Sequence, residues 1–170
     1  AISELGEGSL QKAVNSAGSV ILAGNINNLS GNYSVILAGT GQGLTGDHST
    51  IAVGLNNLLE GNRSFIGAGS GNNINGDNSF IGAGNSNSLT GLNLNLGAGE
   101  ENKITGTNSS ISAGKNNYIS GDNSSVSAGI DNKISGDQSS IGAGFSNKIN
   151  STQSAIVGGP VTRLMPLDLS

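Results

Sequence analysis

The chain has 170 residues, of which 29 are glycine, only 3% are aromatic and 11% are charged, and its formal net charge is −4. With no cluster of basic residues along the sequence and few aromatic side chains, the chain lacks what binding nucleic acid requires, so no nucleic-acid partner is expected. It contains no cysteine, which excludes disulfide bonds and thiolate-bound metals but leaves the redox compartment open. No apolar run approaches the roughly 20 residues that span a bilayer, so we expect no membrane insertion by this segment.

Residues 1–18 do not follow the pattern of the rest of the chain, and we assign them to an N-terminal cap. Within them, Val14 falls fifteen residues before Leu29. This spacing predicts half a coil that begins near Lys12.

A fifteen-residue motif repeats over residues 19–159. Glycine recurs at this interval from Gly24 to Gly159, with an aliphatic residue three positions before each glycine, beginning with Ile21. A second aliphatic residue follows five positions after each glycine, beginning with Leu29. Self-similarity at a fixed short period is typical of stacked repeats, and its strictness argues against the disorder that so much Gly, Ser and Asn would otherwise suggest.

Each repeat alternates in two short stretches, which predicts two strands. Ser, Ile and Ala share one side of the first strand, and Asn and Ile or Leu share one side of the second; we expect both sets to face inward. Glycines such as Gly24 and Gly31 lie between the strands, where a bend with positive φ favours glycine. The predicted fold class is all-β, a parallel β-solenoid (β-roll) of about ten two-strand coils.

The inward polar residues are predicted to be structural, because such side chains can bond backbone groups at the bends and bond their equivalents in the next coil. Serine recurs from Ser19 to Ser154, with Leu94 as the exception. An asparagine ladder recurs one coil apart, with Gln42 in its place once: Asn27, Asn57, Asn72, Asn87, Asn102, Asn117, Asn132 and Asn147.

The outward side of the first strand is apolar in its N-terminal half and rich in Ser and Gly in its C-terminal half. A contiguous apolar patch on an exposed face marks an interface. We therefore predict that this face meets identical chains around an axis, forming a homotrimer through Val20, Leu22, Val35, Leu37, Phe65 and Phe80. The outward column of the second strand, with Lys103, Lys133 and Lys148 beside it, is the predicted solvated side.

Residues 160–170 lose the repeat, and two prolines there remove the backbone donors that a further strand would need. We assign this stretch to a C-terminal exit or neck segment, and we expect the whole chain to be part of a longer protein.

Units such as GDNSFIGAGNSNSLTG (76–91) and GDNSSVSAGIDNKISG (121–136) resemble the YadA-like head repeats of trimeric autotransporter adhesins, and related repeats in bacteriophage tail fibres and other bacterial surface fibres. The resemblance covers residues 19–159 and implies a left-handed β-roll, a homotrimer, and adhesion or fibre building. The unit is one residue longer than the usual head repeat and no matching neck motif is present. Adhesin and phage-type fibre both remain open.

Three groups of residues are candidates for chemistry. Asp122 and Asp137 occupy the same bend one coil apart and resemble a glycosidase carboxylate pair, but Asn and Thr share that column, as expected of turn residues. His48 is a candidate metal ligand, but it is the only histidine in the chain. Glu100 and Glu101 are adjacent to each other, and this pair favours a solvated bend over a calcium site. We predict no catalytic, cofactor-binding or metal site.

The expected function is a non-catalytic, adhesive segment of a trimeric surface fibre, extracellular, on a bacterial cell surface or a virion. Its partners are expected to be its own copies and a host or prey surface receptor, either protein or glycan. Two alternatives are an ice-binding β-solenoid and a polysaccharide-degrading tailspike.

Overall fold

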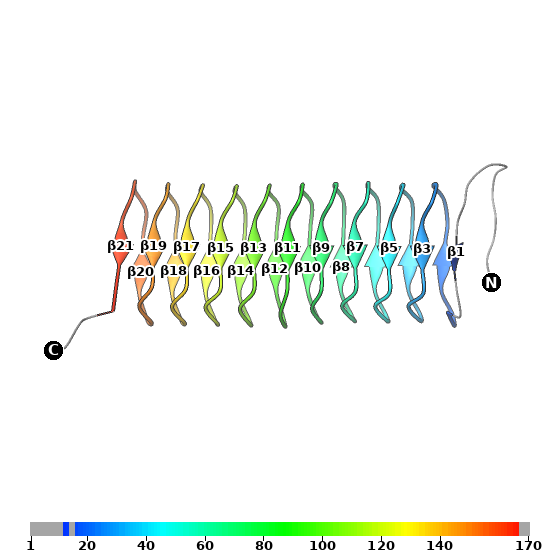
Figure 1. Ribbon diagram of the computed structural model, residues 1–170, viewed down its shortest axis with the longest axis horizontal. Coiled ribbons are helices and arrows are strands. Elements are labelled where there is room, and N and C mark those ends of the chain that lie inside the picture. The colour runs from blue at the N-terminus through cyan, green and yellow to red at the C-terminus, as the bar shows by residue number, and fades with distance from the viewer. Residues whose placement is uncertain (1–11, 14–15, 167–170) are drawn as a thin grey trace.

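The computed structural model describes residues 12–13 and 16–166, and within them the secondary structure is entirely β. The coils stack along one line to form a rod (Figure 1). An 11-stranded sheet contains β1 (Lys12–Ala13), β3 (Asn28–Leu29), β5 (Gly43–Leu44), β7 (Leu58–Leu59), β9 (Asn73–Ile74), β11 (Ser88–Leu89), β13 (Lys103–Ile104), β15 (Tyr118–Ile119), β17 (Lys133–Ile134), β19 (Lys148–Ile149) and β21 (Arg163–Leu164). A 10-stranded sheet contains β2 (Val20–Ile21), β4 (Val35–Ile36), β6 (Thr50–Ile51), β8 (Phe65–Ile66), β10 (Phe80–Ile81), β12 (Asn95–Leu96), β14 (Ser110–Ile111), β16 (Ser125–Val126), β18 (Ser140–Ile141) and β20 (Ala155–Ile156).

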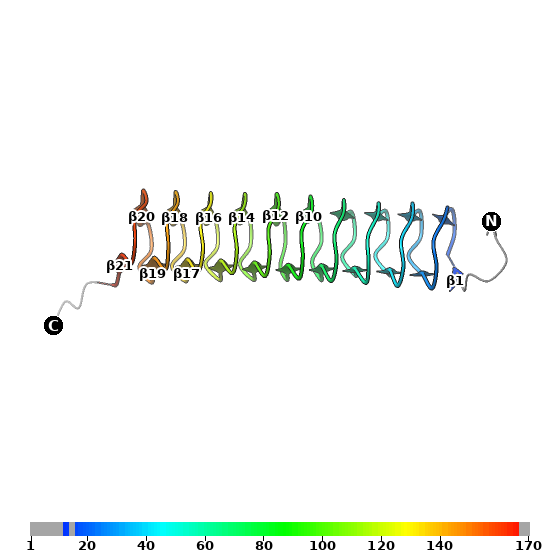
Figure 2. The same cartoon turned by 90° about the horizontal axis from the view of Figure 1, so that it is seen from above.

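The two sheets form opposite faces of the rod (Figure 2). All neighbouring strands pair in parallel, as in Val20 with Val35 and Ile21 with Ile36. A third line of isolated parallel bridges runs from Asn25 to Pro160 along the bend that follows the 10-stranded sheet. The predicted parallel β-solenoid is therefore confirmed.

Backbone hydrogen bonds connect each coil to the next. The N–H of Val20 donates to the carbonyl of Ser34, and the N–H of Leu22 donates to the carbonyl of Ile36; the N···O distance is 3.0 Å in both. The same arrangement recurs along both sheets. The backbone groups of a coil thus depend on its neighbours for their partners, and this makes stacking obligatory.

The core consists of two aliphatic columns, one from each sheet, running the length of the rod. Ile36 and Leu44 in one coil, and Ile51 and Leu59 in the next, are completely buried. The alanine column that we expected to face inward lies outside this core: Ala23 is exposed and Ala38 is only half-buried. That prediction is wrong because each strand is only two residues long, so the chain already bends at the alanine and the alternation ends there.

Buried serines fasten neighbouring coils at one bend. The Ser19 hydroxyl accepts a hydrogen bond from the N–H of Ser34 (3.0 Å) and donates one to the carbonyl of Gly31 (2.7 Å). Ser34 repeats this arrangement with the following coil. Leu94 replaces the serine once; it is only 1% exposed and offers the amide of Ser109 no hydroxyl.

The asparagine ladder fastens the other bend. The Asn72 amide Nδ2 donates to the carbonyl of Gly84 (2.8 Å), and its Oδ1 accepts from the N–H of Asn87 (3.1 Å) and from Asn87 Nδ2 (2.9 Å). The ladder residues are all buried. Because a buried polar group must find a partner within the protein, these side chains have a structural task and are not available to a ligand.

The two bends need glycine for different reasons. In the column of Gly24, φ lies between 112° and 142°, a region that side chains disfavour. In the column of Gly31, φ is not positive, so the predicted reason for that column is wrong. A Cβ there would overlap the carbonyl oxygen of the next coil, as Gly61 with Gly76 illustrates. At this bend, φ is positive at the position two residues after the Gly31 column, in every coil from that of Tyr33 to that of Gln153.

The stack extends past both ends of the 19–159 range. At the C-terminal end, β21 pairs with β19. At the N-terminal end, β1 pairs with β3 at an offset of sixteen residues, so Ala13, not Val14, is the register partner of Leu29. The expected register of Val14 is therefore wrong. Val14 itself lies outside the described residues, as do residues 1–11 of the predicted cap and 167–170 of the exit segment.

Gly61→Ala is expected to lower the stability of the rod by about 3 kcal/mol or more, because the added methyl group meets a backbone atom that cannot move aside. Gly43→Ala is the matched control, since its Cβ approaches only the flexible end of Leu58, at 3.0 Å. The midpoint of urea denaturation measures both variants. Equal midpoints for the two would contradict the close-approach explanation.

Gln42→Asn is expected to stabilise the rod by about 1 kcal/mol. Gln42 Oε1 accepts the N–H of Asn57, but its buried Nε2 has no partner, and an unsatisfied buried donor costs about 1–3 kcal/mol. Asparagine at this position would donate to Gly54 as its equivalents do in other coils. Asn72→Gln, the reverse change, should lower the urea midpoint, and a lower midpoint for Gln42→Asn would show that the longer side chain fits its coil better.

Candidate interaction surfaces

The predicted interface residues lie together on the outer face of the 10-stranded sheet, in its N-terminal half. Leu22, Leu37 and Phe80 are 47%, 40% and 39% exposed. Val20, Val35 and Phe65 are half-buried. The six side chains lie on one face in two groups, separated by the coil of Thr50 and Ala52, and together we call them the apolar face.

Two stacked aromatic rings form part of the apolar face. The rings of Phe65 and Phe80 stack with centroids 5.5 Å apart and planes 8° apart. A Cβ on Gly67 would lie 3.1 Å from the Phe65 ring, and one on Gly82 would lie 3.2 Å from the Phe80 ring. These two glycines therefore leave room for the two rings.

A second group of exposed apolar side chains lies toward the C-terminal end. Ile130 and Phe145 are neighbours in the bridge line, and both are exposed, as are Val157 and Val161. This group was not predicted, because the bend that contains Glu100 and Glu101 in another coil was expected to be solvated. Reading the sequence down the column that begins at Asn25 would have found Ile130 and Phe145.

The candidate carboxylate pair is engaged in hydrogen bonds to the backbone. Asp137 Oδ1 accepts the N–H of Asp122 (2.8 Å), and Asp122 Oδ1 accepts the N–H of Thr107 (2.6 Å). Asp77 makes the same bond with the N–H of Asn62, and this bond lowers the pKa of Asp77, with smaller contributions from the Asn62 side chain and Arg63. Residues in this column cap a bend of the neighbouring coil.

The candidate metal ligands are not gathered into a site. The ring of His48 stacks on Tyr33, with centroids 5.2 Å apart. Lys115 Nζ lies 3.1 Å from Glu100 and 3.9 Å from Glu101, and its bond to Glu100 raises the pKa of Lys115. Across residues 12–13 and 16–166, no group of three or more His, Cys, Asp or Glu residues is placed to hold a metal ion.

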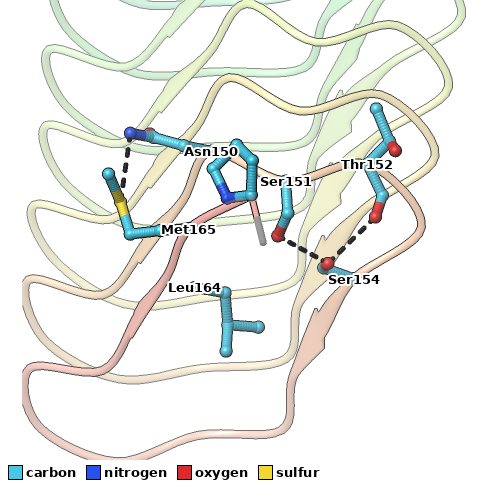
Figure 3. A pocket seen from close by; sticks show the side chains of 7 residues that line it. Asn150, Ser151, Thr152, Ser154, Leu164 and Met165 are labelled. Carbon is cyan, nitrogen blue, oxygen red and sulfur yellow. Dashed lines mark hydrogen bonds between the residues drawn. The ribbon is translucent and has the colours of Figure 1, made fainter. Parts of the chain in front are cut away.

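A pocket lies at the C-terminal end of the rod, beside β21 (Figure 3). Its polar side is already hydrogen-bonded: the hydroxyls of Ser151 and Ser154 lie 2.7 Å apart, and Ser154 donates to the carbonyl of Thr152. Its lining has no titratable side chain and includes Leu164, which packs against the core. The pocket therefore lies at the end of the aliphatic core, over a bend.

A column of four basic residues and one tyrosine lies on the outer face of the 11-stranded sheet. Its members are Lys103, Tyr118, Lys133, Lys148 and Arg163, one from each strand from β13 to β21. We call it the basic stripe. These residues are spread over sixty positions of the chain, and the fifteen-residue period brings them side by side. Lys103, Lys133 and Lys148 were expected on the solvated side, and Arg163 extends their column.

Tyr118 is held between two of these cations. Lys133 Nζ lies 5.1 Å and Lys103 Nζ 5.8 Å from the centre of its ring. The hydroxyl of Thr105 is 3.4 Å from the phenol oxygen. This hydrogen bond lowers the pKa of Tyr118, and a bond to Ser120 and the charges of Lys103 and Lys133 lower it further against the opposing effect of burial.

No model of a known protein family matches the chain, and a search of curated proteins finds no match either. Among the described residues, no helix has the length and apolar character needed to cross a membrane. The surfaces themselves are therefore the basis for assigning a function.

Tyr118 should ionise at a lower pH than a free tyrosine. Absorbance titration in a Tyr33→Phe background isolates its signal, because the chain has two tyrosines. Thr105→Val should raise the pKa of Tyr118 more than Lys103→Gln does, since the hydrogen bond is the larger cause. An ordinary pKa in the parent protein would show that neither the bond nor the charges act on the phenol.

Proposed function

We propose that the chain is a non-catalytic, adhesive segment of a homotrimeric surface fibre that projects from a cell or a virion and binds a target surface. The proposal includes the threefold assembly and the left-handed coil that the resemblance to YadA-like head repeats implies. An extracellular location on a bacterial surface or a virion follows from the same role.

The observation that carries the proposal is the apolar face on a rod. Leu22 and Leu37 project from adjacent coils, and Phe80 continues the same face further along. Monomeric proteins rarely leave such a patch in water, and one of this kind marks an association surface. A sheet face that runs along a rod suits side-by-side association of identical rods, because each coil meets its equivalent at the same height.

Neither alternative function has an observation in its favour. An ice-binding surface requires a regular array of one residue type, whereas the outward column of the 11-stranded sheet mixes Ser30, Thr45, Glu60 and Asn75. A polysaccharide-degrading activity would need a free acid and base, and Asp122 and Asp137 each bond a backbone amide.

Light scattering of the purified chain is expected to give a mass of three times 16.8 kDa. Replacing both Leu22 and Leu37 by serine should shift the protein toward the monomer, because burying each leucine in an interface contributes about 1.5–3 kcal/mol. Circular dichroism and urea denaturation check that the variant still forms the rod.

Leu58→Ser is the matched control, since Leu58 is a leucine of similar exposure on the opposite sheet. It should leave the trimer intact. A wild-type mass of 16.8 kDa at micromolar concentration would refute the trimer, and a shift caused equally by Leu58→Ser would assign the interface to the wrong face.

A further inference from the structure

The basic stripe places like charges next to one another. Lys133 is the direct register partner of Lys148, and Lys148 is the partner of Arg163. Adjacent parallel strands lie about 4.8 Å apart, so the stripe from Lys103 to Arg163 extends roughly 19 Å along the rod. Like charges directly opposite each other destabilise a sheet, and elsewhere in the same column the chain uses neutral residues such as Asn73 and Ser88.

The cations of the stripe have no ionic partner within the described part of the chain. The ion pairs found there are Arg63 with Asp77 and Lys115 with Glu100 and Glu101. Three acidic side chains make hydrogen bonds instead of ion pairs with the stripe: Asp122 and Asp137 accept from backbone amides, and Asp131 accepts from Asn116. The last contact measures 2.6 Å. Four positive charges on one face of a chain with a net charge of −4 are thus left for an external anion.

We propose that the basic stripe binds a linear acidic polysaccharide that lies along the axis of the rod. Lys103 and Lys133 are two coils apart, about 10 Å by the strand spacing, which is close to the length of a disaccharide. Their ammonium groups, with those of Lys148 and the guanidinium of Arg163, bind the carboxylate or sulfate groups of the glycan. The proposal rests on the proposed role as a surface-binding fibre, and it names the chemical class of the receptor.

Two further features fit a glycan. The column next to the stripe offers hydroxyl groups from Thr105, Ser120 and Ser135, which can bond sugar hydroxyls. The Tyr118 side chain supplies an aromatic ring within the stripe, half-buried between cations. The surface therefore combines anion-binding and sugar-binding groups in one line.

The charge density of the stripe favours a glycan over nucleic acid. Double-stranded DNA carries one charge per about 1.7 Å of axis and each strand one per about 3.4 Å. The stripe supplies at most one cation per coil, about 4.8 Å apart, and a single aromatic ring. A polyuronate, with one carboxylate per sugar ring, carries its charges about 5 Å apart, which is the interval between successive coils of the stripe.

Isothermal titration of the full chain tests this with a defined heparin oligosaccharide and an oligoguluronate, using neutral dextran and single-stranded DNA for comparison. Binding to at least one acidic glycan is expected, weakening as salt is added. Replacing both Lys133 and Lys148 by glutamine should weaken that binding about tenfold, since it removes two of the four cations of the stripe. The matched control Lys115→Gln removes one charge outside the stripe and should change binding less than threefold.

Several results would overturn the proposal: no binding to either acidic glycan, equal loss in the stripe variant and in Lys115→Gln, equal binding of dextran, or tighter binding of DNA. Light scattering on the same samples separates this inference from the proposed function. A trimer that binds neither glycan would support the trimeric fibre and refute glycan binding by the stripe. A monomer that binds glycan through the stripe would refute the trimer and support glycan binding.

Discussion

The whole structure depends on backbone hydrogen bonds that join neighbouring coils instead of closing within one coil. Because the amides of one coil, such as those of Val20 and Leu22, find their carbonyl partners in the next, a single coil has no means of holding its own shape. Two aliphatic residues per coil add little burial, so cooperativity along the stack replaces the deep core of a globular domain. The serine and asparagine columns complete this arrangement, because their side chains bond backbone N–H and C=O groups at the bends, where the short strands provide no partner.

The two places where these columns are interrupted show how strict the requirement is. At Leu94 the hydroxyl is lost, yet the bend remains closed over a fully apolar side chain. At Gln42 the acceptor is kept while the donor is left without a partner. A polar column therefore tolerates the loss of one contact as long as its neighbours above and below hold the register.

Periodicity was sufficient to predict the parallel solenoid, its two aliphatic columns and its inward Ser and Asn residues, because each follows directly from spacing. The exposed position of Ala23 was not predictable in this way, since alternation does not say where a strand ends. The role of Gly31 was also missed, because a close approach between backbones is a property of the stacked coils and not of one. The three lysines of the basic stripe were expected together on the solvated side, but Arg163 was not added to them because the repeat was expected to end at residue 159.

The direction of the hydrogen bonds also determines how the rod responds to force. They run along its axis, so a pull applied between the two ends loads them in tension rather than in shear, and adjacent coils can come apart one pair at a time. Such a rod lengthens progressively under load, and each released coil adds slack to the chain. Strands that lie crosswise to a pull thus make the rod compliant along its length.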